Sequence, residues 1–191
     1  MLRVTCTLTG TAPLSFGGAI RSEKTKKESH DAFEERTWQE RAHVDEHGEL
    51  YIPAMALKKA LEESAKYIGE TIPGKGMQRY TKRFERGVLV TENLMLGVTL
   101  SDVEKERLFV PSDGVSGGGK RVWKNFPTLR SWSCEAVLII LDELIIENPD
   151  RVREYLENAG QFIGMGRFRP ERKGFYGRFK VSDFSAEPFE G

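Results

Sequence analysis

The chain has 191 residues and a mass of 21.7 kDa, with 29 basic and 29 acidic side chains and 39% hydrophobic residues. A chain of this size buries a hydrophobic core without needing disulfides or metals, and its composition excludes intrinsically disordered proteins. No apolar run approaches the roughly 20 residues that a membrane-spanning helix needs. A formal net charge of zero argues against a protein that coats nucleic acid indiscriminately.

Hydrophobic periodicity and turn residues place the elements of the first half of the chain. Residues 21–47 are polar and charged, so we expect a long insertion there with a short helix near Phe33–Arg41. The segment Ala54–Ile68 is expected as a helix, because apolar residues recur at helical spacing and Gly69 follows. The other expected elements are a strand at Arg3–Leu8, a turn at Ala12–Gly18, a strand at Leu50–Pro53 and a basic connection at Thr71–Arg86.

The second half predicts strands, one helix and two loops. The segment Trp132–Ile146 is expected as a strand, and its middle, Val137–Leu141, is apolar on both faces, as in a central strand. A helix is expected at Pro149–Ala159, with Asn148 as its N-cap. The other expected elements are strands at Gly87–Leu100 and Arg107–Val110 around a turn at Asp102–Glu106, a flexible segment at Ser112–Lys124, a basic loop at Gly164–Gly174 and a closing strand at Phe175–Val181.

This order of elements is the split β-α-β arrangement of ferredoxin-like folds. We therefore predict an α+β, ferredoxin-like (RRM-like) fold with an antiparallel sheet, two helices and long insertions at about 21–47 and 111–130. The sequence has no internal repeat and no natural domain boundary, so a single domain over residues 1–191 is expected.

The two cysteines lie in apolar, strand-like segments. Cys6 and Cys134 are too few for a zinc cluster, and we expect reduced thiols in the core. The first ten residues lack the long apolar segment and cleavage site of a secretory signal. These observations favour a cytoplasmic protein.

Basic side chains gather in three glycine-containing stretches. Residues 75–86, 117–130 and 164–180 carry formal net charges of +4, +4 and +5, so the remainder of the chain carries −13. The segment 135–157 alone holds seven acidic residues. Such segregation lets a neutral protein present one positive face to an anionic ligand.

Aromatic residues are interleaved with the basic ones in the same stretches. Rings supply stacking faces for unpaired bases, while Arg and Lys neutralise the adjacent phosphates. Trp123 and Phe126 lie in a loop-like context with Gly and Pro, and we predict that they stack on bases or wedge between them. The alternative is that they are core residues flanked by solvated charges, which is the favoured interpretation for Phe175 and Phe179.

Two motifs occur far apart in the chain. One is GELYIPAMALKKAL at Gly48–Leu61, and the other is GMGR at Gly164–Arg167, which continues to GFYGRF at Gly174–Phe179. The first resembles the glycine, strand, Ile-Pro, small-residue, Leu-Lys and helix segment of the RAMP superfamily, the RNA-binding proteins of CRISPR systems. The second is similar to the C-terminal glycine-rich loop of that superfamily. The chain departs from the pattern at residues 54–56, where Ala-Met-Ala replaces the usual Gly-Ser-Ser.

The resemblance is closest to the backbone subunit that polymerises along guide RNA. It implies an RRM-like domain with thumb-like and web-like insertions and head-to-tail self-assembly. The implied partners are a guide-like single-stranded RNA, further copies of the chain in a homo-oligomer or filament, and other CRISPR subunits, with no membrane. The chain is short for a backbone subunit, as expected for a compact relative from a virus or mobile element.

The residues of the motifs also suit phosphate binding for physical reasons. Glycines at 164 and 166 lack Cβ atoms, so the backbone can approach a phosphate and offer N–H donors, and arginines add bidentate contacts. The N-terminal end of the 54–68 helix favours anions. The alternatives are a structural turn and a solvated helix face. The predicted nucleic-acid site comprises Lys58, Lys59, Trp123, Phe126, Gly164, Gly166, Arg167, Arg169, Arg172 and Lys173.

Catalytic candidates lie only in the 21–47 segment, where His30 and Asp31 are adjacent. Some RAMP ribonucleases use a histidine to abstract the 2′-hydroxyl proton, and some type III backbone subunits use a loop aspartate to promote cleavage of the target strand. The chemistry would be transesterification, with Lys26 or Arg36 stabilising charge. A solvated loop is the favoured interpretation, so His30 and Asp31 are weak candidates.

Metal and cofactor sites are not indicated. His43 and His47, with Asp45 between them, have no further ligands that converge in sequence. The chain has no Walker loop, dinucleotide fingerprint or nucleophile elbow, so we expect no cofactor.

The leading hypothesis is a non-catalytic, RAMP-like protein that binds single-stranded RNA and assembles along it. A second hypothesis is an endoribonuclease of the same fold that acts through His30 or Asp31. A third is an interaction protein that mimics a backbone subunit and docks into a CRISPR effector complex to interfere with it. The sequence leaves RNA and DNA open as ligands.

Overall fold

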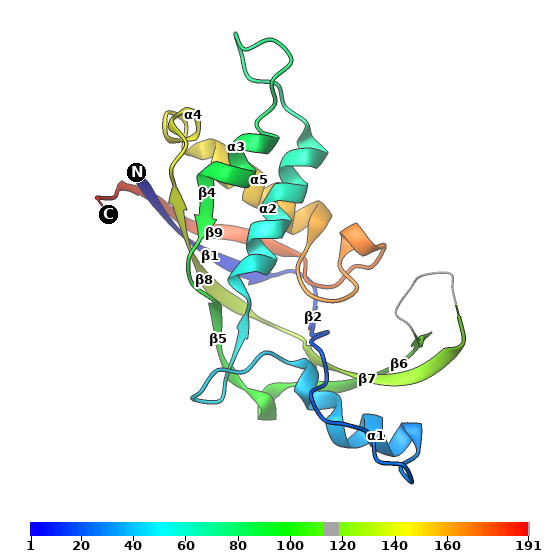
Figure 1. Ribbon diagram of the computed structural model, residues 1–191. Helices are drawn as coiled ribbons and strands as arrows, with labels where there is room; N and C mark the ends of the chain where they lie inside the picture. Colours follow the sequence, from blue (N-terminus) through cyan, green and yellow to red (C-terminus); the bar gives the residue numbers. More distant parts are fainter. Residues whose placement is uncertain (113–118, 191) are drawn as a thin grey trace.

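The structure is a computed structural model, and it describes residues 1–112 and 119–190. Figure 1 shows a sheet with helices on one face, and a β-hairpin with a short helix that extends from one end of this sheet. The fold is mixed α/β with antiparallel sheets and a ferredoxin-like core, which confirms the fold class predicted from the order of elements.

The main sheet has the strand order β4-β8-β1-β9, and all neighbouring strands are antiparallel. The split β-α-β arrangement produces this order. Strand β9 forms one edge, and its pairing with β1 shifts register between Thr5 and Thr7, where Asp183 has a left-handed φ of 49°. The strands are β1 (Leu2–Gly10), β4 (Val88–Val90), β8 (Ser133–Ile140) and β9 (Phe179–Pro188).

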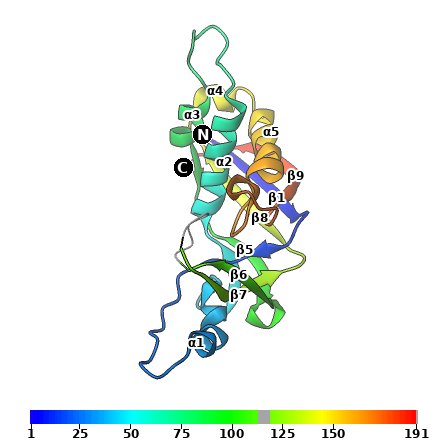
Figure 2. The same cartoon turned by 90° about the vertical axis from the view of Figure 1, so that its right-hand side faces the viewer.

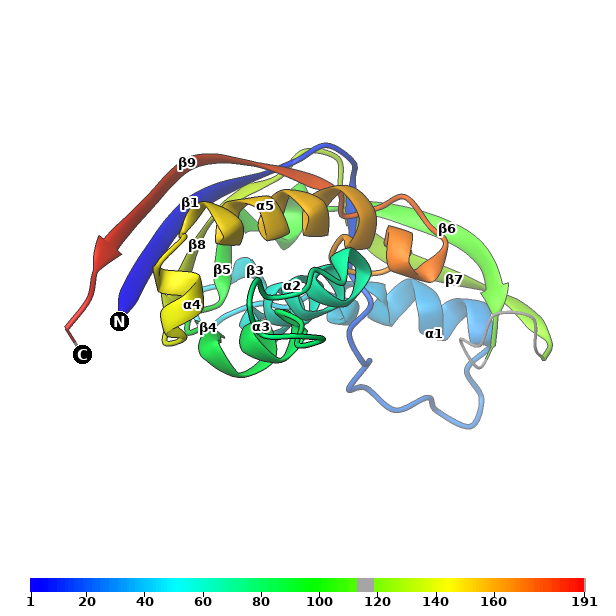
Figure 3. The same ribbon diagram turned by 90° about the horizontal axis from the view of Figure 1, so that it is seen from above.

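Three helices cover one face of the main sheet (Figure 3). They are α2 (Ala54–Ile68), α3 (Thr81–Gly87) and α5 (Asp150–Asn158). Alternate residues of β1 point towards them, and Val4, Cys6 and Leu8 are buried while Arg3 is exposed. Phe84 of α3 and Tyr155 of α5 stack with ring centroids 4.2 Å apart.

Both cysteines lie in this core as free thiols. Burial raises the pKa of Cys6 and that of Cys134 to about 12. At neutral pH both thiols are therefore protonated and unreactive, as expected for structural cysteines.

Two smaller sheets accompany the main sheet. One has the order β2-β7-β6 and contains the extended hairpin, and the other pairs β3 with β5. Helix α1 and the 3₁₀ helix η1 pack against β7. We call α1, η1, β6 and β7 the hairpin module. The elements are β2 (Leu14–Ser15), α1 (His30–Thr37), η1 (Trp38–Arg41), β3 (Glu49–Ile52), β5 (Leu94–Thr99), β6 (Glu104–Pro111) and β7 (Arg121–Leu129).

Several expected elements differ in the first two thirds of the chain. The connection 71–86 contains helix α3, because Phe84 is buried between α2 and α5 and anchors a short amphipathic turn. The single strand expected at 87–100 is broken into β4 and β5, which belong to different sheets. Strand β6 starts at Glu104, inside the expected turn. The segment expected to be flexible contains the start of β7, and part of it, including Gly117 and Gly118, lies outside the described residues.

Other differences fall near the C-terminal third. The strand expected at 132–146 ends at Ile140, because Asp142 caps a short helix, α4 (Glu143–Ile146), by accepting from the Leu144 N–H. Helix α5 has Pro149 rather than Asn148 at its N-cap. Strand β9 begins at Phe179, four residues later than expected, since the residues before it belong to a loop.

Short helical turns complete the chain. They are η2 (Leu100–Asp102), the π-helix η3 (Ala159–Ile163) and η4 (Pro170–Arg172). Within the described ranges no helix has both the length and the apolar character to cross a membrane.

Candidate nucleic-acid interface

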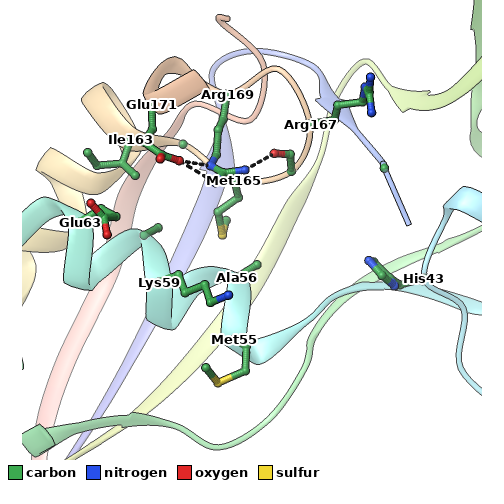
Figure 4. Close-up of a pocket in the computed structure, with 14 residues that line it drawn as sticks. His43, Met55, Ala56, Lys59, Glu63, Ile163, Met165, Arg167, Arg169 and Glu171 are labelled. Carbon is green, nitrogen blue, oxygen red and sulfur yellow. Dashed lines mark hydrogen bonds and ion pairs between the residues drawn. The ribbon is translucent and has the colours of Figure 1, made fainter. Parts of the chain in front are cut away.

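A pocket of about 470 Å³ lies between helix α2 and the loop of residues 164–177, which we call the glycine loop. Helix α2 contributes Met55 and Lys59, and the glycine loop contributes Gly164–Arg167 and Arg169. His43 closes one side (Figure 4). The two sequence motifs, far apart in the chain, therefore line one cavity.

Glycines let the glycine loop fold tightly against its neighbours. Gly166 has φ 74°, and a Cβ there would lie 2.7 Å from the Ser15 carbonyl oxygen. Gly164 donates its N–H to Ala159, and Arg167 donates its backbone N–H to Ser15. The Gly166 N–H makes no hydrogen bond with the described residues. Of the two glycine N–H groups, it is therefore the one left to bind an anion. These glycines are therefore required for the packing of the glycine loop itself.

The two adjacent lysines of α2 have different surroundings. Lys58 is 8% exposed, and its Nζ donates to the Phe84 and Glu85 carbonyl oxygens at 2.6 and 2.9 Å. Lys58 therefore caps α3 and does not reach the pocket, which corrects its predicted role. Lys59 is exposed, extends along the pocket (Figure 4) and forms no ion pair in the described part of the chain.

Arg167 is held by aromatic rings. Its Cζ atom lies 4.1 Å from the centroid of Phe126 and 4.6 Å from that of Phe168. Its Nε is buried without a hydrogen-bond partner, and no described carboxylate forms an ion pair with it. Burial lowers the pKa of Arg167, and the nearby Arg41 adds to this shift. A partly buried guanidinium with unused donors is a strong site for an anion.

Arg167 lies beside a buried ion pair that joins α1 to η1. Arg41 Nη2 contacts both carboxylate oxygens of Glu34 at 2.8 and 2.9 Å, and its Nε donates to the Asn125 carbonyl oxygen. Arg41 also lies over the Phe126 ring. Two guanidinium groups therefore share one ring and one nearby carboxylate, which leaves local positive charge in excess.

The remaining cations of the glycine loop are differently engaged. Arg169 donates to Glu171 and to the Gly166 carbonyl oxygen, as Figure 4 shows. Arg172 lies 3.3 Å from the same Glu171 carboxylate and stays largely exposed. Lys173 is exposed at the end of η4 with a left-handed φ of 64°. One carboxylate thus offsets part of the charge of two arginines.

The hairpin module carries an exposed row of rings and cations. Trp123 and Phe109 are each 46% exposed, and their centroids lie 5.2 Å apart. Arg107 lies 5.1 Å from the Trp123 ring, and Arg121 lies 5.3 Å from Phe109. These four residues form the hairpin cluster. Sequence reasoning missed Phe109, although its place two residues after Arg107 in a predicted strand puts both on one face.

Phe126 does not join the hairpin cluster. It is 1% exposed, and the guanidinium groups of Arg41 and Arg167 contact its ring. The prediction that Phe126 stacks on a base is therefore wrong, because the glycine loop and η1 cover this part of β7. The Phe126 ring instead packs in the interior against these two guanidinium groups.

The catalytic candidates lie at the start of α1, next to the hairpin cluster. His30 Nε2 is 3.0 Å from the Trp123 carbonyl oxygen, and Asp31 is 3.7 Å from Arg107.

No cluster of three potential metal ligands occurs among residues 1–112 and 119–190, and His47 is largely exposed.

Stability should respond to pH through His43. Burial lowers the pKa of His43 from its ordinary value of 6.5, and Arg21 adds to the shift. Protonation therefore favours the unfolded chain, and stability is lost as the pH falls below about 6.5. We expect His43→Gln to lose less thermal stability than the parent protein between pH 7.5 and about 5.5, measured by melting temperature. Equal losses in the two proteins would contradict this assignment.

Comparison with protein-family models gives no match, and comparison with curated protein sequences gives none. Among solved structures, the chain is similar to one in the cryo-EM structure of the type III-B Cmr-beta bound to cognate target RNA. The TM-score is 0.56 and the identity 12%, over 97% of this chain and 60% of that one. It is also similar to Cmr6 from Pyrococcus furiosus, with a TM-score of 0.52 and 12% identity over 95% of this chain and 99% of that one. The chain thus spans about 60% of the Cmr-beta chain's length, and at these identities the likeness concerns the fold.

Proposed function

We propose that the chain is a non-catalytic, RNA-binding subunit of a CRISPR-type ribonucleoprotein. The structural neighbours support this, since one is Cmr6 and the other belongs to a Cmr-beta complex bound to target RNA. The ligand is a single strand, whose phosphates lie in the pocket between α2 and the glycine loop.

The observation that carries the proposal is the state of Arg167. Its guanidinium is fixed by two rings, partly desolvated and without an ion-pair partner among the described residues. The Nε atom is closed to solvent, so a phosphate oxygen would accept from the terminal nitrogens of Arg167, which make no hydrogen bond with the described residues. Lys59 and Gly166 line the same pocket; Lys59 adds a second charge, and the Gly166 N–H makes no hydrogen bond with the described residues.

The hairpin cluster gives the same strand a place for its bases. Trp123 and Phe109 offer half-exposed rings, and Arg107 and Arg121 lie beside them as cations. Base stacking on such rings contributes about 1–3 kcal/mol per base and tolerates any sequence. The proposed contacts are thus phosphate-centred and independent of sequence.

Salt dependence tests the proposal. If one bound unit neutralises roughly 6 to 10 phosphates, affinity for a single-stranded RNA falls by about two and a half to four decades between 50 and 200 mM salt. Fluorescence anisotropy with a labelled RNA measures this slope. Binding that is unchanged over the same range contradicts the proposal.

Substitution of the pocket cations locates the contact. We expect Lys59→Ala/Arg167→Ala to weaken binding about ten- to a hundredfold for every RNA sequence, because two charge-assisted contacts are lost. The control is Arg3→Ala/Lys180→Ala, which removes two exposed cations from the face of the sheet opposite the helices. Equal affinities for the two variants would show that the pocket is not the site.

Assembly of copies along the strand, or with other CRISPR subunits, belongs to the same proposal. Protein that copurifies with nucleic acid of regular length after nuclease digestion supports a fixed footprint per subunit. Protein that binds a CRISPR complex but no RNA would instead support the interaction-protein hypothesis.

A second candidate activity is RNA cleavage, and it rests on the contact between Asp31 and Arg107. Asp31 lines a pocket of about 310 Å³ together with Arg107 and Trp123, next to the proposed base-stacking rings. A ribonuclease that uses this carboxylate or His30 would cleave labelled RNA during long incubation, with or without divalent metal. Intact RNA under both conditions would eliminate this activity.

A further inference from the structure

A second basic groove lies on the other side of α2, between helix α3 and the loop of residues 69–80. Figure 1 shows this loop projecting beyond the ends of α2 and α3. The cavity has a volume of about 1120 Å³, and ten residues line it. They are Lys75, Met77, Gln78, Arg79, Thr81, Lys82, Arg83, Glu85, Arg86 and Asp142. None of them lines the pocket of the glycine loop.

Each wall of the groove carries two cations that have no ion-pair partner among the described residues. Lys82 and Arg86 are four residues apart on α3, so they share one face of the helix. Lys75 and Arg79 lie on the projecting loop, which doubles back through a bridge between Thr71 and Arg79. All four side chains are exposed, and none forms an ion pair in the part of the chain that the structure describes.

The acidic residues nearby are engaged by other partners. Asp142 accepts from Arg83 at 3.0 Å, so this pair adds no net charge to the groove. Glu70, at the base of the loop, is bound by Arg151 at 2.9 Å and by the Tyr155 hydroxyl at 3.0 Å. Among the described lining residues, Glu85 is the one remaining acid against the four other cations, which leaves a formal charge of +3.

The loop wall is anchored at its base. Tyr80 and Ile72 are buried, and Arg151 lies 4.0 Å from the centroid of the Tyr80 ring. Together with the Glu70 contacts, this packing fixes both ends of the loop against α5. Lys75 and Arg79 are therefore held opposite α3 before any ligand binds, which reduces the entropy lost on binding.

We propose that this groove binds the phosphates of a second segment of single-stranded nucleic acid. Its cations line two opposing walls instead of converging on one point, which suits a run of phosphates better than one small anion. Among the described residues that line it there is no aromatic side chain and Met77 is the one apolar side chain, whereas protein interfaces are enriched in aromatics and depleted in lysine. The proposal rests on the proposed function for its ligand class, but on different residues.

The test compares two charge-matched variants. Lys82→Ala/Arg86→Ala removes two groove cations at exposed helical positions, where alanine is well tolerated, and Arg3→Ala/Lys180→Ala removes two cations elsewhere. Anisotropy titrations use a uridine oligonucleotide of about 40 nucleotides and one of about 6, a length within the site sizes of single-strand binders. Circular dichroism confirms that each variant is folded.

We expect the groove variant to bind the long oligonucleotide about tenfold more weakly. The slope of log affinity against log salt should fall by about 1.4, because each lost contact to a single strand removes about 0.7. Affinity for the short oligonucleotide, which the glycine-loop pocket alone can hold, should remain unchanged. A long-oligonucleotide slope equal to that of the control variant overturns the inference.

The two proposals fail separately. If Lys59→Ala/Arg167→Ala binds RNA like the parent while the groove variant is weakened, the glycine-loop pocket is not the site and the groove is. If the groove variant loses only its capture of a protein partner and keeps the parent's salt slope for RNA, the groove binds protein and the inference is wrong.

Discussion

Replacing Glu34 by alanine is expected to lower the free energy of unfolding by about 3 to 5 kcal/mol. The substitution leaves Arg41, a residue that is 7% exposed, without the carboxylate whose two oxygens contact its Nη2 atom. The Asn125 N–H also loses its acceptor, since it donates to Glu34 at 3.1 Å. Arg167 lies nearby with its own uncompensated charge, so repulsion between the two guanidinium groups adds to the loss.

Urea unfolding measures this effect, and a neighbouring glutamate provides the control. Glu35 is on the same helix but 60% exposed, and it pairs with Lys105 at 2.5 Å. We expect Glu35→Ala to cost no more than about 1 kcal/mol, as is usual for exposed pairs. Equal losses for Glu34→Ala and Glu35→Ala would show that burial does not govern the contribution of this network.

Replacing Gly177 by alanine is expected to destabilise the protein by about 3 kcal/mol or more and to abolish RNA binding. Gly177 has φ 66°, and a Cβ there would lie 1.8 Å from the Met165 carbonyl oxygen. The Gly177 carbonyl oxygen in turn accepts from the Met165 N–H. The added methyl group therefore forces apart the two sides of the glycine loop and displaces Arg167.

Gly97 gives a matched control for the backbone conformation. It has the same φ of 66°, but a Cβ there would meet nothing within 4 Å. We expect Gly97→Ala to cost only about 1 to 2 kcal/mol from the left-handed backbone and to leave RNA binding intact. If the two alanine variants have similar stability and affinity, the close approach of Gly177 to Met165 is not what shapes the glycine loop.

The parts of the fold that the sequence predicted well are those with repeated local signals. Helix α2 has the bounds expected, because its apolar residues recur over four turns and Gly69 ends it with a left-handed φ of 63°. The order of the main sheet followed from the order of elements. Helix α3 was not predicted. It has only seven residues, and its burial depends on tertiary contacts with α2 and α5.

The sequence predicted which segments form the candidate site better than it predicted which side chains face it. The pocket brings Lys59 to the glycine loop, as expected, yet it excludes the adjacent Lys58. Which lysine faces the loop is decided by α3, which covers the other side of α2. Similarly, Trp123 and Phe126 lie on one strand, but only the region near Phe126 is covered by η1 and the glycine loop. Such choices depend on tertiary packing.

The irregular edge of β9 limits how copies of this protein can meet. A straight edge strand offers a continuous row of backbone donors and acceptors, on which a strand of another molecule can add. Here the register shift opposite Thr5–Thr7 and the left-handed Asp183 interrupt that row near its middle. Growth of one continuous sheet across molecules is therefore disfavoured at this edge.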